Sequence, residues 1–213
     1  LFLTKDKILS KHSSTYYIGD VGSYSVALMS IFGMGNSAAA IKTTQAIREL
    51  EPSFVFMFGI AGGVGDEISL SDVIVSTTIL YYEGAKIKSG RKETRPQSIQ
   101  ADRVVLTKLQ NFSAQNRKPY QIKFGPFAAG EKVIADSNEI EKLRKFEPKL
   151  LGVEMESFGV ALAANEDILR PRFIAIRGVS DHADEEKDDS FREKALQNAA
   201  DFIYSFLLAD ATL

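Results

Sequence analysis

The sequence contains no cysteine and only two histidines among its 213 residues. The lack of cysteine excludes a disulfide framework and a thiolate metal site, and two histidines offer few ligands for a metal. We therefore expect no metal cofactor. A chain without cysteine also fits a reducing, cytoplasmic setting.

The sequence also lacks an excess of basic residues. It carries 26 Lys and Arg against 28 Asp and Glu, for a formal net charge of −2. Proteins that bind the phosphate backbone of nucleic acids usually show a basic excess, so we expect no nucleic-acid partner. With 45% hydrophobic and 25% charged residues, the composition is not that of a disordered chain.

No hydrophobic run is long enough to cross a bilayer. The longest, from Phe54 to Val64, contains three glycines and is much shorter than the roughly 20 residues that a spanning helix needs. Near the N-terminus, Lys5, Asp6 and Lys7 interrupt the apolar positions, unlike the continuous apolar region of a signal peptide. We expect neither a membrane span nor a signal peptide.

Strand-like and helix-like segments alternate along the chain, which predicts an α/β domain, and the length favours a single domain over residues 1–213. The predicted strands cover residues 16–19, 23–32, 53–60, 73–82, 121–129, 150–153 and 172–179. The predicted helices cover residues 36–50, 101–116, 137–146, 158–164 and 190–208.

Four local features refine this prediction. Asn36 and Ser137 are typical helix caps, and the apolar positions of the first helix include Ile41. Residues 53–60 are almost wholly apolar, which predicts a central strand buried on both faces. Residues 83–98 are polar and predict a long functional loop.

Two acidic motifs contain candidate catalytic carboxylates. They are GVEMES at residues 152–157 and RGVSDHAD at residues 177–184. Cleavage of a purine N-glycosidic bond needs an acid for the departing base and a carboxylate near the ribose, and Asp181 and Glu156 suit these roles. Each motif alone also fits a simpler reading, a solvated helix start for the glutamates and a helix cap for SDHAD. Their combination favours a nucleoside site.

Two glycine motifs are less specific. GMGN at residues 33–36 lacks the third glycine of a dinucleotide fingerprint and the Lys-Ser/Thr of a P-loop, so it fits a tight turn as well as an anion site. GIAGGVGD at residues 59–66 follows an apolar strand and emerges where α/β folds bind ligands. Close packing would also explain its glycines.

Four segments in order, IAGGVGDEISLSDVIVS, GPFAAGEKVIAD, GVEMES and RGVSDHAD, resemble the superfamily of purine nucleoside phosphorylases and methylthioadenosine/S-adenosylhomocysteine nucleosidases over nearly the whole chain. The resemblance implies a three-layer α/β/α sandwich around a twisted mixed sheet. It also implies that Asp181 protonates or hydrogen-bonds purine N7, that Glu156 and Met155 hold ribose, that Val133 and Ile134 read the base edge, and that Gly62 lines the nucleophile site. The predicted site comprises catalytic Asp181 and Glu156 with substrate-binding Ala61, Gly62, Val133, Ile134, Glu154, Met155, Ser180, Arg91 and Arg95.

The departures from the family bear on the nucleophile. Members that use phosphate usually have an arginine and a small hydroxyl residue where this chain has Met57 and Ile60, so water is favoured over phosphate. A phosphate would need backbone amides near residues 33–36 and 61–63, or another arginine. Nucleosidases typically carry a glutamate base in a motif such as GAMEEE, which is absent before Tyr16. Either the domain lacks its first strand or the nucleophile is activated differently.

The basic segment GAKIKSGRKETRP at residues 84–96 and the acidic tail DHADEEKDDSF at residues 181–191 resemble nucleosidase-like domains of multidomain defence proteins, some of which cleave ATP. In the family a loop at residues 81–96 often crosses a dimer interface, which implies a homodimer or higher homo-oligomer. Its Arg91 and Arg95 would suit a 5′ phosphate, although each alone is also typical of a solvated loop.

The sequence therefore predicts an enzyme that hydrolyses the N-glycosidic bond of a purine, chiefly adenine, nucleoside or nucleotide. A phosphorolytic purine nucleoside phosphorylase and a non-catalytic nucleotide-sensing domain are the alternatives. No organic cofactor is implied, and the co-substrate is water or phosphate.

Overall fold

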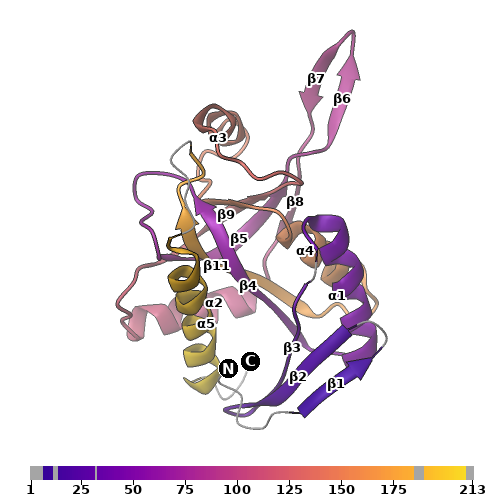
Figure 1. Ribbon diagram of the computed structural model, residues 1–213, viewed down its shortest axis with the longest axis vertical. Helices are drawn as coiled ribbons and strands as arrows, with labels where there is room; N and C mark the ends of the chain where they lie inside the picture. The colour runs from indigo at the N-terminus through magenta and orange to yellow at the C-terminus, as the bar shows by residue number, and fades with distance from the viewer. Residues whose placement is uncertain (1–6, 12–13, 32, 185–189, 210–213) are drawn as a thin grey trace.

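The computed structural model describes residues 7–11, 14–31, 33–184 and 190–209 and shows a mixed β-sheet flanked by helices (Figure 1). The strands of this central sheet are β4 (Phe54–Gly63), β5 (Val73–Tyr81), β8 (Gln97–Gln100), β9 (Ile122–Ala129), β10 (Gly152–Glu154) and β11 (Arg172–Asp181). The helices are α1 (Asn36–Leu50), α2 (Arg103–Gln115), α3 (Ser137–Arg144), α4 (Ser157–Glu166) and α5 (Arg192–Ala209). Most of the acidic tail after Asp184, and residues 1–6 near the N-terminus, lie outside the described residues.

The central sheet has the strand order β11-β4-β10-β9-β5-β8, with parallel and antiparallel neighbours. β11 also pairs with β5, through residues 176–178 and 73–75. The pairing of β11 with β5 closes a ring of five strands, β11, β4, β10, β9 and β5. The sequence did not predict this closure. The mixed twisted sheet itself is confirmed.

Helices cover both sides of the sheet, as the three-layer prediction requires. On one side α1 and α4 pack on alternate strand residues that include Met57 and Val179. On the other side α2 and α5 pack on the intervening positions, such as Ile174 and Ile176. Because successive side chains of a strand point to opposite faces, an apolar strand such as β11 supplies both cores at once.

Three N-terminal strands, β1 (Lys7–Lys11), β2 (Ser14–Val21) and β3 (Tyr24–Leu28), form a separate antiparallel sheet. The fully buried Tyr16 of β2 donates its hydroxyl to Glu49 of α1 at 2.7 Å. Burial and this hydrogen bond raise the pKa of Tyr16 to about 12. The contact fastens the small sheet to the helical layer. The strands predicted at residues 16–19 and 23–32 correspond to β2 and β3, which pair with each other.

Several local predictions were wrong. The N-cap of α1 is Gly35 rather than Asn36, and Asp136 rather than Ser137 caps α3, accepting from the amides of Asn138 and Glu139. Ile41 is exposed, because the buried stripe of α1 follows residues 39, 43 and 47, and position 41 lies off it.

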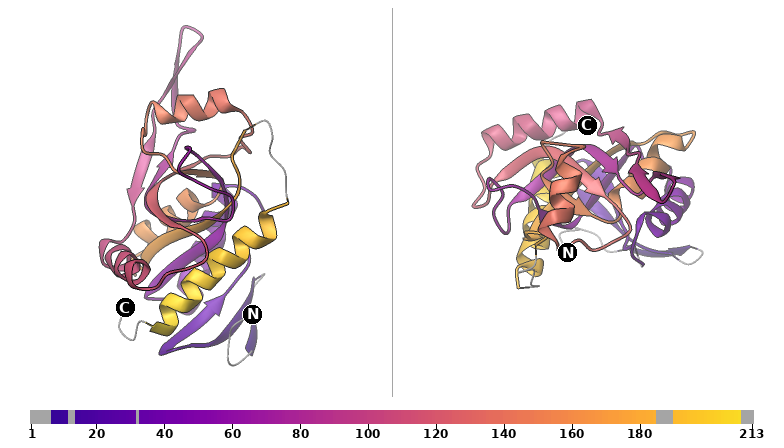
Figure 2. Two further views of the ribbon diagram at one scale, coloured as in Figure 1. Left: turned by 90° about the vertical axis from the view of Figure 1, so that its left-hand side faces the viewer. Right: turned by 90° about the horizontal axis from the view of Figure 1, so that it is seen from above.

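The polar segment 83–98 is more ordered than a loop. It forms the hairpin of β6 (Ala85–Lys88) and β7 (Arg91–Thr94), and then enters β8. Ser89 and Gly90 at its turn both have positive φ, of 49° and 75°, as tight hairpin turns with a right-handed twist require. In Figure 1 and in the left view of Figure 2 the hairpin extends away from the body of the molecule.

Strand β4 differs from the prediction at one edge. It pairs with β11 along its length, but with β10 only at Gly62 and Gly63. Among the described residues, no strand pairs with the second edge of residues 54–61, and most of their side chains are only half-buried. The strand is therefore less enclosed than its apolar sequence implies.

In the part of the chain that the structure describes, no helix has the length and apolar character needed to cross a membrane.

A polar cluster fastens α5 to the segment before β9. Asp201 of α5 accepts hydrogen bonds from Lys118 at 2.8 Å and from Tyr120 at 2.6 Å. Burial acts to raise the pKa of Asp201, but the hydrogen bonds from Lys118 and Tyr120 outweigh it and lower the pKa overall. A carboxylate with a lowered pKa stabilises the fold above its unfolded pKa, and this contribution is lost as the pH falls through the folded value.

We expect Asp201→Asn to lower the free energy of unfolding by about 1 kcal/mol at pH 7, since its side chain is 44% exposed and solvent screens the interaction. Urea unfolding at several pH values measures this. The difference between wild type and variant should shrink below about pH 4, where the unfolded carboxyl is protonated. If the difference in unfolding free energy stays constant across this pH range, the charge of Asp201 does not contribute to stability.

Candidate active site

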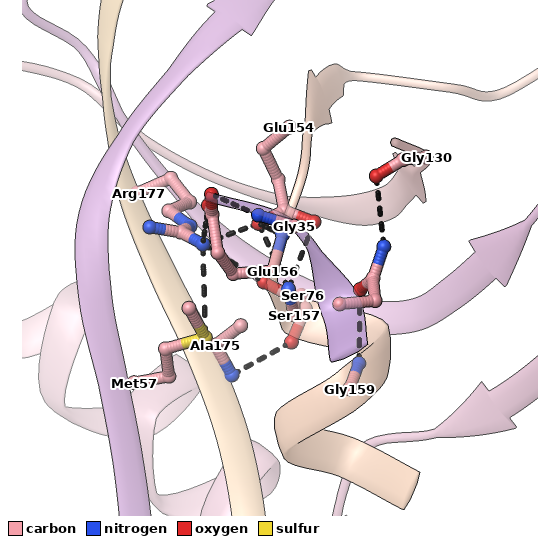
Figure 3. Close-up of polar contacts among 11 residues, drawn as sticks. Gly35, Met57, Ser76, Gly130, Glu154, Glu156, Ser157, Gly159, Ala175 and Arg177 are labelled. Atoms are coloured by element: carbon pink, nitrogen blue, oxygen red, sulfur yellow. Dashed lines mark hydrogen bonds and ion pairs between the residues drawn. The ribbon is translucent and has the colours of Figure 1, made fainter. Parts of the chain in front are cut away.

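Glu154, at the end of β10, organises the first half of the site. It is 8% exposed, and its carboxylate accepts hydrogen bonds from the amides of Glu156, at 3.0 Å, and Ser157, at 2.9 and 3.1 Å. These contacts cap the start of α4 and fix the turn that carries Glu156. Glu154 also forms an ion pair with Arg177 (Figure 3). Its oxygens are therefore directed at protein donors, among them the amide of Glu156.

Arg177, on β11, is a residue that the sequence reasoning missed. It is 4% exposed, and besides Glu154 its Nη2 lies 3.5 Å from Glu156 Oε2, 3.3 Å from Ser157 Oγ and 3.6 Å from Met57 Sδ. A buried guanidinium needs a counter-charge. An arginine within the apolar run FIAIRGV was the signal that could have found this pair.

Glu156 is held more loosely than Glu154. Its side chain is 23% exposed, and its oxygens lie 3.5 Å from Arg177 Nη2 and 3.4 Å from the amide of Gly35, both long contacts. Burial raises the pKa of Glu156, and the opposing effect of Arg177 does not cancel it. A carboxylate with such weak protein contacts is free to accept hydrogen bonds from ligand hydroxyls. Met155 stands half-buried between the two glutamates.

The first turn of α1 brings a further carboxylate to the site. The amide of Gly35 points at Glu156, and the amide of Asn36 donates to Glu131 Oε2 at 3.2 Å. The side chain of Asn36 instead donates to the carbonyl of Gly130 at 2.8 Å and accepts from the amide of Gly159 at 2.9 Å. Two of the amides that the GMGN motif offers to an anion, those of Gly35 and Asn36, are therefore directed at carboxylates of the protein.

Asp181 ends β11, where the register against β4 shifts. Val179 pairs with Ala61 but Asp181 pairs with Gly62, so Ser180 is the extra residue of a bulge. Bulges redirect side chains next to functional sites. Asp181 is 5% exposed, and its two oxygens accept from Ser180 Oγ at 2.7 Å and from the amide of Ala183 at 3.0 Å.

The glycine loop and the predicted base-reading segment both approach Asp181. A side chain at Gly62 would meet the Asp181 carboxylate at 3.0 Å, and the carbonyl of Ala61 accepts from Ser180 Oγ at 3.3 Å. Ile134 packs on a cluster that includes Ala183, whereas Val133 is 61% exposed.

The structure thus brings together most of the predicted residues, because β10 joins the two halves. Val153, next to Glu154, pairs with Gly62, which lies against Asp181. Arg91 and Arg95 are the exceptions. They belong to the hairpin arm, where Arg95 lies 3.7 Å from Glu93. Within the described residues, no cluster of three or more metal-binding side chains is present.

Comparison with solved structures shows how widely this fold is shared. The chain aligns with the methylthioadenosine/S-adenosylhomocysteine nucleosidase of Neisseria meningitidis, in complex with methylthio-immucillin-A, with a TM-score of 0.84, 24% identity and coverage of 98% of this chain and 91% of the other. The S-adenosylhomocysteine nucleosidase of Streptococcus pyogenes, bound to 5-methylthiotubericidin, gives a TM-score of 0.85 at 22% identity and covers 99% and 90%. At these identities the likeness shows a common fold.

Sequence comparison gives the same relationship. The methylthioadenosine/S-adenosylhomocysteine nucleosidase of Desulfotalea psychrophila is 27% identical over 189 residues, covering 87% of this chain and 79% of the relative. The nucleosidase of the same name from Staphylococcus haemolyticus is 26% identical over 200 residues, covering 90% and 86%. The sequence model of the phosphorylase superfamily matches residues 4–208. A chain matched over nearly its whole length, and folded as these proteins are, belongs to the phosphorylase superfamily.

Proposed function

We propose that this protein is a nucleosidase that hydrolyses the N-glycosidic bond of an adenine nucleoside or nucleotide. The observation that carries the proposal is the charge of the site beside α1. The amides of Gly35 and Asn36 face Glu156 and Glu131. Carboxylates at these positions would repel a phosphate nucleophile but accept hydrogen bonds from water. The names of the relatives, all nucleosidases for adenine-containing compounds, support the same reaction.

The proposed mechanism separates two charges that develop as the bond breaks. Asp181, held by Ser180 and the amide of Ala183, delivers a proton to purine N7, which neutralises the leaving base. Glu156 accepts hydrogen bonds from the ribose hydroxyls and stabilises the cationic sugar. Water attacks the anomeric carbon from the side of the glycine loop. Glu154, through the amide of Glu156, and Arg177, through its guanidinium, keep Glu156 in position.

Phosphorolysis is the alternative, and the residues at its anion site argue against it. Met57 is buried and contacts Arg177, and Ile60 is half-buried in β4. Neither side chain binds phosphate. Arg177 is the buried cation near these positions, and it faces two glutamates.

We further propose a homodimer or higher homo-oligomer in which the hairpin β6–β7 reaches a second subunit. Two short strands that lack a packed face are marginally stable alone, and this hairpin is exposed along nearly all of its length. Lys88 and Arg91 face each other across it, a like-charge pair that an anion between them would stabilise. Because the hairpin extends from the body (Figure 2), Arg91 would serve a substrate bound by the neighbouring subunit.

The domain organisation and location are also proposals. We propose that residues 1–213 form one domain that lacks the first strand of the family, and the unpaired edge of β4 over residues 54–61 supports this. The cytoplasmic location stays a prediction.

The first prediction tests the catalytic acid. Asp181→Asn should lower the rate of adenine release by about 100-fold or more, as loss of general acid catalysis does, and leave nucleoside binding largely intact. Chromatography of free adenine and calorimetric titration measure the two quantities. Asp66→Asn, an exposed carboxylate on the same glycine loop, is the matched control and should retain full activity. If the wild-type protein binds adenosine compounds but releases no free base, the proposed enzymatic activity is wrong.

The second prediction separates water from phosphate as the nucleophile. The rate of adenine release should be the same with and without added phosphate, since the amides of α1 face carboxylates. The sugar product should be free ribose or its 5′-substituted form. Ribose 1-phosphate that accumulates in proportion to phosphate would establish the phosphorylase instead.

The third prediction concerns the hairpin. The double variant Arg91→Ala, Arg95→Ala should reduce the use of ATP and AMP about tenfold or more, and that of methylthioadenosine much less, because charge-assisted contacts to phosphate contribute roughly 1.5 to 3 kcal/mol each. A substrate panel with light scattering for the oligomeric state measures this. Arg103→Ala with Arg117→Ala removes the same charge elsewhere and should spare all substrates. If activity falls equally for charged and uncharged substrates, the hairpin shapes the pocket but does not bind phosphate.

A further inference from the structure

We propose that Glu131 is the general base that takes the proton from the attacking water. The inference rests on the proposed hydrolysis and adds a residue that the sequence reasoning did not consider. Glu131 follows β9, and its Oε2 accepts from the amide of Asn36 at 3.2 Å. The neighbouring amide, that of Gly35, lies 3.4 Å from Glu156 Oε1. Two carboxylates from distant parts of the chain therefore meet on consecutive amides.

The backbone at Gly35 makes room for this meeting. Gly35 has a φ of 94°, which side-chain-bearing residues rarely adopt, and a Cβ placed on it would collide with the Glu131 carboxylate. Any other residue at position 35 would displace the Glu131 carboxylate, which accepts from the amide of Asn36. The glycine of the GMGN motif thus serves the approach of a carboxylate.

Asn36 holds the same three segments together. It is 5% exposed, and its side chain bonds the carbonyl of Gly130, next to Glu131, and the amide of Gly159 in α4, three residues beyond Glu156. An amide bonded on both sides in a buried position is a rigid connection. It fixes the spacing between Glu131 and Glu156, as a base and a ribose-binding carboxylate require.

The two carboxylates differ in what else they contact. Glu156 has its second oxygen directed at Arg177, whereas Glu131 Oε1 has no hydrogen-bond partner among the described residues and is open to solvent. Glu156 is thus arranged to hold a ligand between fixed partners. Glu131 has an oxygen available to receive a proton.

A second observation indicates that a small acceptor completes the cluster. The Nε of Arg177 is buried and has no hydrogen-bond partner in the described part of the chain. Buried donors are nearly always satisfied by protein or by ordered water. A water molecule beside Arg177 would satisfy this donor and lie next to the guanidinium that Glu156 also contacts.

The proposed step is balanced in atoms and electrons. The bond between N9 and the anomeric carbon breaks, and its electron pair passes into the purine, which takes a proton from Asp181 at N7. The water oxygen forms the new bond to the anomeric carbon and gives its proton to Glu131. Adenine and the free sugar leave, and proton exchange with solvent restores both carboxyl groups. Nothing is oxidised or reduced.

A purely structural role for Glu131 is the competing explanation. The N-cap residue of α1 provides no side-chain hydrogen bond. On this explanation Glu131 caps the helix in its place and has no catalytic role. Glu131→Gln distinguishes the two roles, because the amide oxygen still accepts from Asn36 but cannot take a proton. If Glu131 is the base, kcat should fall about 100-fold or more with unchanged thermal stability and little change in KM.

Two further measurements complete the test. The acidic limb of the kcat/KM profile should be less steep in Glu131→Gln than in wild type, because Glu156 is then the one remaining proposed catalytic carboxylate that must be ionised, and formate should restore part of the rate of Glu131→Ala. Glu141→Gln, an exposed carboxylate on α3, is the control and should match wild type. An unchanged kcat in Glu131→Gln, or a loss explained by lower stability, would overturn the inference while adenine release by wild type continues. If wild type releases no adenine, the proposed function fails, and this inference fails with it.

Discussion

The buried ion pair between Arg177 and Glu154 is the contact on which the site depends. Each charge would be costly to bury alone, and removing one member of such a pair typically destabilises a protein by about 3–5 kcal/mol. The pair crosses from β11 to β10, two strands that are not neighbours in the sheet order. Because Glu154 also accepts from the amides of Glu156 and Ser157, the pair fixes the start of α4 and the direction of Glu156.

Around this pair, backbone geometry rather than side-chain chemistry brings the remaining groups together. The bulge at Ser180 turns Asp181 toward Gly62, and Asn36 joins α1 to α4 and to the segment after β9. The carboxylates of the candidate site therefore lie at junctions between elements. Such a site is rigid only when the surrounding sheet and helices are folded, so stability and activity should be closely linked.

Much of the fold was predictable, because apolar periodicity is a local signal. The positions of α2, α5, β5, β9 and β11 follow directly from it. The errors have equally local causes. Gly35 rather than Asn36 is the N-cap of α1 because of its backbone conformation. At α3 the cap is one of two adjacent polar residues, and the structure selects Asp136 rather than Ser137. The arm at residues 85–94 has no buried face, so its strands leave no hydrophobic pattern to detect.

The sequence by itself determined the α/β class, and it singled out Asp181 as the candidate acid and Glu156 as the candidate ribose-binding carboxylate, since alternating segments and residue types in short motifs are local signals. Only the tertiary structure decided what each carboxylate contacts. Glu154 and Glu156 are two residues apart in one motif, yet one is buried against Arg177 and the other is open to a ligand. Glu131 joins them from a distant segment. The physical reason is that burial and hydrogen-bond partners, which set the role of a carboxylate, come from neighbours in space that sequence order does not reveal.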